Sequence, residues 1–234
     1  GHAALDPAAP ASQAPSSGAR ARLVLAPPVR EEPLTLRELS DFVKEPVKAF
    51  FRQRLAVAFE HPDPAGDDQE PFELDGLQKW KLQDELTQAQ ASALARGDDI
   101  AAVREGLLAA IRRRGDLPAG GFGAATAHDL AAPMDDLFDR FRRALARWPH
   151  ALAQEEVRFA TTAHGDRIEL ADWLPGIRGD DAGGRGRVVL ESSDLVKDGH
   201  YRRERVIRHW VAHLAAHVAG GPLTTMLVSK VGDV

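Results

Sequence analysis

The sequence predicts one α+β (α/β) domain, with helices on its N-terminal side and a small, mostly antiparallel sheet. Three observations lead to this class. Residues 35–148 repeat apolar positions at helical spacing, whereas residues 155–193 form short strand-like segments separated by turns. Residues 201–219 return to a helical pattern before a last strand-like stretch, 222–234. This order of elements is typical of helices packed on a sheet.

The bulk composition fits one domain with a tail. The chain has 234 residues, of which 44% are hydrophobic, and a net charge of −5, so it lacks the basic balance that holds DNA by bulk charge. Residues 1–32 are rich in Ala, Pro and Ser, so we expect a disordered tail or linker before a domain at 33–234. The absence of cysteine excludes disulfides, iron–sulfur ligation and a thiol nucleophile. No apolar run is long enough to span a membrane, and we expect a cytoplasmic protein.

The helices of the first half have recognisable ends. Thr35 and Glu38 form a T-x-x-E capping box. Pro46 lies inside the pattern that follows, which predicts a kink or two short helices. Further helices are expected over 74–95, 98–114 and 133–148. The glycine-rich stretch 115–123 lacks the GK[ST] ending of a phosphate-binding loop, so we interpret it as a loop without that function.

The last predicted helix has two features that bear on chemistry. Its core face is expected to be an apolar stripe, consisting of Ile207, Trp210, Val211, Leu214 and Val218. Beside that stripe, His209, His213 and His217 are spaced by four, as a metal site on a helix requires. Because no carboxylate lies among them, a position at the edge of the core is the favoured interpretation, with metal binding as the alternative.

Four arginines cluster at the start of this helix: Arg202, Arg203, Arg205 and Arg208. A guanidinium can bind a phosphate through two parallel hydrogen bonds. With a net charge of −5, a solvated face with acidic neighbours is the leading interpretation. Contact with DNA or with a partner protein is the alternative.

Five carboxylates on the strands could supply a metal site: Asp166, Glu169, Asp172, Glu191 and Asp194. Hydrolysis by two metal ions needs acids that converge from neighbouring strands. Glu169 and Asp172 are three residues apart, so a regular strand points them to opposite faces. The nearest lysine to Glu191 is Lys197, which we place beyond the strand. We therefore expect no metal site here.

Four separated stretches resemble the C-terminal region of the RecC family, the gamma subunit of exodeoxyribonuclease V. These are LTLRELSDFVKEPVKAFFRQRLAV, EPFELDGLQKWKLQDEL, GDLPAGGFG and RVIRHWVAHLAAHVAG. The resemblance covers residues 33–234. It implies a restriction-endonuclease-like core related to the nuclease domain of RecB, but catalytically inactive. It also implies a chain that continues past Val234.

The resemblance also indicates which residues replace the catalytic ones. Active relatives carry G-x-I-D on one strand and V-D-Y-K on the next, which align here with LADWLP and VVLESS. The two acid positions are then Leu174 and Leu190, and the lysine position is Ser192. Iron–sulfur relatives place a cysteine before a proline in the opening helix, where this chain has Glu45, so no cluster is expected.

The implied function is architectural. Such a domain supports subunit assembly and guides DNA at the point where the duplex is split, during recombinational repair of double-strand breaks. Its expected partners are RecB-like and RecD-like subunits and DNA, and no cofactor is expected in this chain, since ATP and magnesium belong to the partner subunits. Two alternatives stay open. One is a metal-dependent DNase using Glu191 with Asp172 or Glu169 and Lys197, and the other is a helical interaction module outside DNA repair.

Overall fold

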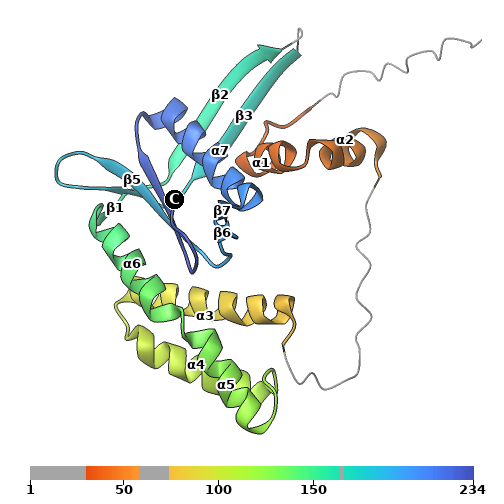
Figure 1. Ribbon diagram of the computed structural model, residues 1–234. Helices are drawn as coiled ribbons and strands as arrows, with labels where there is room; N and C mark the ends of the chain where they lie inside the picture. Colours follow the sequence, from red (N-terminus) through yellow and green to blue (C-terminus); the bar gives the residue numbers. More distant parts are fainter. Residues whose placement is uncertain (1–29, 58–73, 164–165) are drawn as a thin grey trace, which may run out of the picture. The chain divides into compact units, whose positions relative to one another are not determined.

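The computed structural model describes residues 30–57, 74–163 and 166–234, so most of the predicted tail lies outside the described residues. Residues Glu32–Val234 form one compact unit. The helices are α1 Leu36–Lys44, α2 Pro46–Leu55, α3 Gly76–Arg96, α4 Ile100–Arg114, α5 Gly120–Ala131, α6 Met134–Ala146 and α7 Arg203–Gly220 (Figure 1). The strands are β1 His150–Ala151, β2 Glu155–Ala163, β3 Asp166–Leu174, β4 Ile177–Gly179, β5 Arg185–Glu191, β6 Val196–Lys197, β7 His200–Tyr201 and β8 Thr224–Ser229. The predicted α+β class is confirmed.

The first two helices form where the sequence predicts them. The backbone N–H of Glu38 donates to Thr35 Oγ1 at 3.1 Å, and the N–H of Thr35 donates to Glu38 Oε2 at 2.9 Å. These reciprocal bonds satisfy donors that a helix start leaves free. Pro46 is the first residue of α2, and α1 ends at Lys44, so the proline separates two short helices.

The interpretation of residues 115–123 as a loop is only partly right, because α5 begins inside it at Gly120. A β-carbon on Gly123 would lie 2.1 Å from the carbonyl oxygen of Pro118. The helix therefore starts immediately after a tight turn that only glycine permits. Gly123, one of the glycines that suggest a loop in the sequence, is required for this close approach of helix and turn.

The main sheet has the strand order β1-β4-β5-β8. β4 and β5 are antiparallel, whereas β8 runs parallel to β5, from Gly186 opposite Thr224 to Glu191 opposite Ser229. Because parallel neighbours need a long connection, α7 serves as the crossover between them. β2 and β3 form a separate antiparallel hairpin. The sheet is thus mostly antiparallel, as predicted, but its last strand is parallel.

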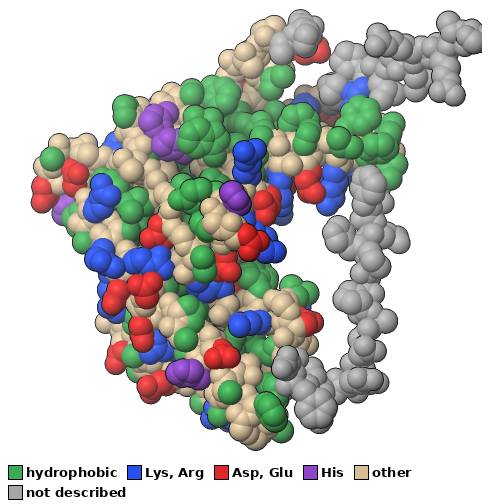
Figure 2. Space-filling model, in the orientation of Figure 1, with side chains coloured by type: hydrophobic (Ala, Val, Ile, Leu, Met, Phe, Trp, Pro, Cys, Tyr) green, Lys and Arg blue, Asp and Glu red, His purple; other side chains and the backbone are tan. Residues whose placement is uncertain are grey.

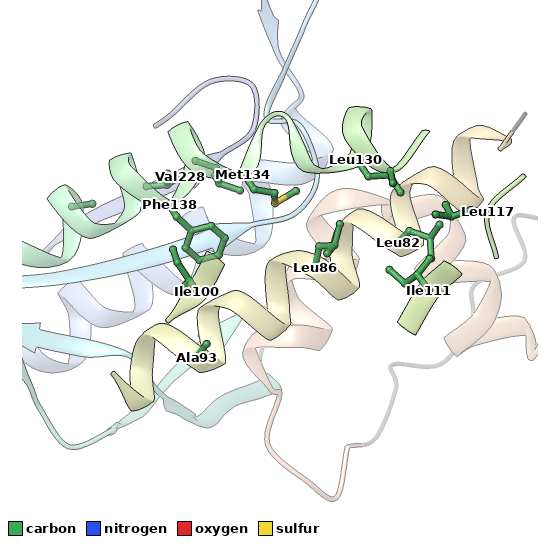
Figure 3. Close-up of a cluster of buried hydrophobic side chains, with 13 residues drawn as sticks. Leu82, Leu86, Ala93, Ile100, Ile111, Leu117, Leu130, Met134, Phe138 and Val228 are labelled. Atoms are coloured by element: carbon green, nitrogen blue, oxygen red, sulfur yellow. The ribbon is translucent and has the colours of Figure 1, made fainter. Parts of the chain in front are cut away.

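The described residues form two hydrophobic cores, of which the first packs against the β5–β8 pair. The helical core joins α3, α4, α5 and α6 to one face of the sheet, and Figure 3 shows Phe138, Met134 and Val228 within it. The α7 core joins α7, α1 and the β2–β3 hairpin. Successive residues of a strand point to opposite faces, and Val188 and Leu190 of β5 pack against the helical core.

The predicted core face of α7 is wrong at three positions. Trp210, Leu214 and Val218 are 55%, 48% and 65% exposed. The buried positions are His209, Val211, Ala212, Ala215 and Ala216. α7 packs against α1 and β2, and small alanine side chains allow this close approach. The bulky apolar residues are left on the outer face.

Candidate functional site at the end of β5

Glu191, the last residue of β5, is buried and bound by two side chains of α7. Its Oε2 accepts a hydrogen bond from the Arg208 guanidinium and lies 3.0 Å from His209 Nε2. Arg208 Nε also lies 3.1 Å from the same ring nitrogen. One ring nitrogen cannot donate and accept at once, so a proton on Nε2 favours the carboxylate contact. We call these three residues the Glu191 cluster.

The charge state of Glu191 follows from these contacts. Burial alone would raise its pKa, but the hydrogen bond from His209 and the charge and hydrogen bond of Arg208 together lower the pKa below its ordinary value. Glu191 is therefore ionised at neutral pH. Its carboxylate faces an arginine and a histidine of its own chain.

The two leucines at the predicted acid positions lie in different cores. Leu174 is 2% exposed within the α7 core, whereas Leu190 packs against the helical core. In the antiparallel β4–β5 pair, Ile177 lies opposite Arg187. If this pairing continued for three more residues, Leu174 would lie opposite Leu190. Leu174 instead pairs with Glu155 of β2, because the chain turns at Gly176, which has a φ of +78°. Ser192, at the predicted lysine position, is buried.

The carboxylates of the alternative nuclease site have other partners. Asp172 accepts the backbone N–H of Leu36 at 2.8 Å and so holds the start of α1. Glu169 lies 3.6 Å from both Arg158 and Arg167. Lys197 is exposed on β6. Within the described ranges, no three His, Asp or Glu side chains are arranged to hold a metal ion.

Arg208 also lines a cavity of about 660 Å³, together with Leu174, Asp172 and Arg187. Burial lowers the pKa of Arg187, and the charge of Arg208 lowers it further. Two neighbouring guanidinium groups therefore line this cavity, together with the carboxylates of Asp41 and Asp172. The positive charges weaken the attraction of the cavity for a divalent cation.

The three histidines of α7 bind separate partners. His209 belongs to the Glu191 cluster, His213 Nδ1 lies 3.1 Å from Thr225 Oγ1, and His217 Nε2 lies 3.0 Å from the Leu223 carbonyl oxygen. Burial lowers the pKa of His213, and the charge of His217 adds to this. Figure 2 shows histidine beside hydrophobic side chains over α7. The geometry agrees with the favoured interpretation, in which the histidines lie at the edge of the core.

The four arginines at the start of α7 do not form one patch. Arg208 joins the Glu191 cluster and Arg203 is exposed. Arg202 and Arg205 line a cavity of about 590 Å³. We call it the basic cavity. Its lining residues are Gly76, Leu77, Lys79, Trp80, Gln83, Ser193, Asp194, Arg202, Arg205 and Lys230.

Of the residues that line the basic cavity, sequence reasoning singled out only Asp194, Arg202 and Arg205. Trp80 Nε1 donates to Ser193 Oγ at 3.1 Å, which ties α3 to the end of β5. The ammonium of Lys230 donates to Gln83 Oε1 and lies 3.6 Å from Asp194. Lys230 follows β8 directly in the sequence, far from α3. No local motif could indicate that these residues meet.

The fold and the site together define the chain as an α+β domain whose sheet is completed by a parallel crossover through α7, with a closed carboxylate cluster at the end of β5. The chain belongs to the RecC C-terminal domain family, whose profile matches residues 31–230. It is similar to the RecBCD enzyme subunit RecC of Escherichia coli (strain K12), with 32% identity over 149 residues. That match covers 64% of this chain and 12% of the relative, so the chain spans a small part of that protein. The helices of the described ranges include none that is long and apolar enough to cross a membrane.

Proposed function

We propose that this chain is a non-catalytic, nuclease-like domain of an exodeoxyribonuclease V gamma subunit. It serves as a scaffold for assembly with RecB-like and RecD-like subunits and guides DNA at the duplex-splitting point, in recombinational repair of double-strand breaks in the cytoplasm. ATP and magnesium act in the partner subunits. Membership of the RecC C-terminal domain family and the similarity to a RecBCD subunit support this assignment.

The observation that carries the non-catalytic part of the proposal is the environment of Leu174, Leu190 and Ser192. Magnesium requires oxygen ligands, and both leucines contribute hydrocarbon to hydrophobic cores instead. Ser192 offers no positive charge to a scissile phosphate. The sheet supports a nuclease-like core, because an antiparallel β4–β5 pair is followed by a parallel crossover through α7 to β8.

The alternative is a metal-dependent DNase using Glu191 with Asp172 or Glu169 and Lys197. For this site to form, Glu191 would have to leave Arg208 and His209, and Asp172 would have to release the N–H of Leu36. Both rearrangements break contacts that the fold already makes. The geometry therefore favours the scaffold over the DNase.

A cleavage assay separates these two functions. The chain is incubated with end-labelled linear DNA and magnesium or manganese, alongside Glu191→Ala and the exposed control Glu105→Ala. We expect no metal-dependent cleavage by any of the three proteins. Cleavage that Glu191→Ala abolishes and Glu105→Ala retains would establish the DNase and refute the scaffold proposal.

A pull-down tests the assembly role against the second alternative, a helical interaction module outside DNA repair. We expect the tagged chain, shown to be folded by circular dichroism, to retain the RecB-like or the RecD-like subunit. A folded chain that retains neither subunit would favour the interaction module.

A further inference from the structure

We propose that the basic cavity binds single-stranded nucleic acid, with a phosphodiester group held by its cations and an unpaired base stacked on Trp80. The choice of DNA as the physiological ligand rests on the proposed function. The binding chemistry itself rests on the residues of the cavity, which four separate segments bring together: the start of α3, the segment after β5, the start of α7 and the segment after β8.

The cavity carries four cationic side chains, Lys79, Arg202, Arg205 and Lys230, and one carboxylate, Asp194. Two of these cations have acidic partners. Arg202 Nε donates to Glu204 at 3.0 Å, and Lys230 lies 3.6 Å from Asp194. In the part of the chain that the structure describes, Lys79 and Arg205 have no carboxylate within salt-bridge distance. They are the cations that remain available to a ligand.

Arg205 brings to the cavity a buried donor that no acceptor of the described residues pairs with. Its Nε is buried and has no acceptor within hydrogen-bonding distance among the described residues. A buried donor without an acceptor is unfavourable, and a guanidinium can bind a phosphate through two parallel hydrogen bonds. A phosphodiester oxygen in the cavity would supply the acceptor.

The cations also repel one another. Burial lowers the pKa of Lys230, whereas Asp194 raises it. The charge of Lys79 adds to the decrease in the pKa, and the charge of Asp84 opposes it. Lys79 and Lys230 come from α3 and the end of β8, so the fold itself places like charges at one cavity. A bound anion would relieve this repulsion. Figure 2 shows acidic and basic side chains intermingled over the face in view, so a local cavity is a better anion site than the surface as a whole.

Trp80 adds the second half of the recognition. Its indole N–H is fixed by Ser193 Oγ at 3.1 Å, while the residue stays 37% exposed. A fixed aromatic ring beside a cationic groove is the arrangement that binds single strands, because a base stacks on the ring and the backbone lies on the charges. Bases in a duplex are already stacked and paired, so this arrangement selects single strands. A volume of about 590 Å³ lies in the usual range for ligand sites.

The test is fluorescence anisotropy of a labelled thymidine oligomer of about 15 nucleotides, titrated with the full chain at low salt. Arg205→Ala is expected to weaken binding about tenfold and to reduce the dependence of log K on log salt by about 0.7. The matched control is Arg203→Ala. Arg203 lies two residues before Arg205 on the same helix and is exposed, so this variant should bind within about twofold of the unchanged chain.

Two variants at Trp80 separate stacking from folding. Trp80→Ala should weaken binding about tenfold, whereas Trp80→Phe, which loses the bond to Ser193 but keeps a ring, should retain most of it. Equal losses in both would overturn the stacking role. Equal losses in Arg203→Ala and Arg205→Ala would overturn the cavity as the site.

The remaining arms identify the ligand. Inorganic phosphate and thymidine monophosphate should compete only weakly, and a duplex of the same length should bind less tightly than the single strand. Competition by either small phosphate as strong as that of the oligomer, or equal binding of the duplex, would refute a single-strand site. Failure here while the partner subunits are retained refutes this inference alone. Oligomer binding without partner retention refutes the proposed function alone.

Discussion

Glu191→Gln replaces the buried carboxylate of the Glu191 cluster with a neutral amide of nearly the same shape. The carboxylate is contacted by Arg208 and by His209, whose side chains are 61% and 7% exposed. A hydrogen bond to a charged group contributes roughly 1.5–3 kcal/mol and a neutral one roughly 0.5–1.5 kcal/mol. The substitution therefore costs about 1 kcal/mol per contact, and less for the solvent-exposed Arg208.

The expected loss is thus about 1.5 kcal/mol in the free energy of unfolding at neutral pH. For a folded unit of this size, that corresponds to a fall of roughly 3–6 °C in Tm. Urea titration followed by tryptophan fluorescence measures the loss. The control is Glu105→Gln, an exposed residue of α4, which should change stability by less than about 0.5 kcal/mol.

The dependence on pH gives a second, independent readout. The pKa of Glu191 is lowered in the folded state, so its contribution is fully present above the unfolded pKa of about 4.3. The contribution is lost as the pH falls through the lower, folded pKa. The stability difference between the unchanged chain and Glu191→Gln should therefore shrink in acid. A difference that is absent at pH 7, or that grows as the pH falls, would show that the cluster does not stabilise the fold.

Three further substitutions test the packing around the site, each by the same urea titration. Phe138→Ala, in the helical core at 0% exposure, should cost about 4 kcal/mol, whereas Phe122→Ala, at 69% exposure, should cost less than about 0.5 kcal/mol; similar values would contradict the assigned core. Gly186→Ala places a β-carbon 2.2 Å from the Trp148 ring, so we expect a loss of about 2 kcal/mol and a changed tryptophan spectrum, and an unchanged spectrum would refute the close contact. Asp172→Ala removes the acceptor for the N–H of Leu36 and should cost about 1 kcal/mol; a neutral result would show that α1 does not need this bond.

Local signals in the sequence predict the start of each early helix well. The capping box joins Thr35 to Glu38, three residues later, and the break between the first two helices is due to Pro46 itself. Both features depend only on neighbouring residues, so the sequence alone reveals them. The start of α5 could not be predicted in this way. Its glycines look like a loop until Pro118 is known to lie against Gly123.

The orientation of α7 depends on tertiary contacts, so the hydrophobic pattern does not predict which face of the helix is buried. Counting large apolar residues selects Trp210 and Leu214 for the core, but the small side chains of Ala212 and Ala216 allow the closest approach to α1 and β2. The arginines at the start of the same helix were found from the sequence as a group. Their division between the Glu191 cluster and the basic cavity depends on which neighbouring segments lie beside each arginine, which the residue spacing alone does not reveal.

The position of Val228 has a consequence for the order in which the molecule can fold. Val228 is 1% exposed inside the helical core, although β8 is made long after α3 to α6 have left the ribosome. Until that strand arrives, the apolar surfaces of those helices lack part of their cover, and closing them needs a contact that is distant along the chain. A nascent chain of this kind stays open to chaperones, and to aggregation, until β8 has been synthesised.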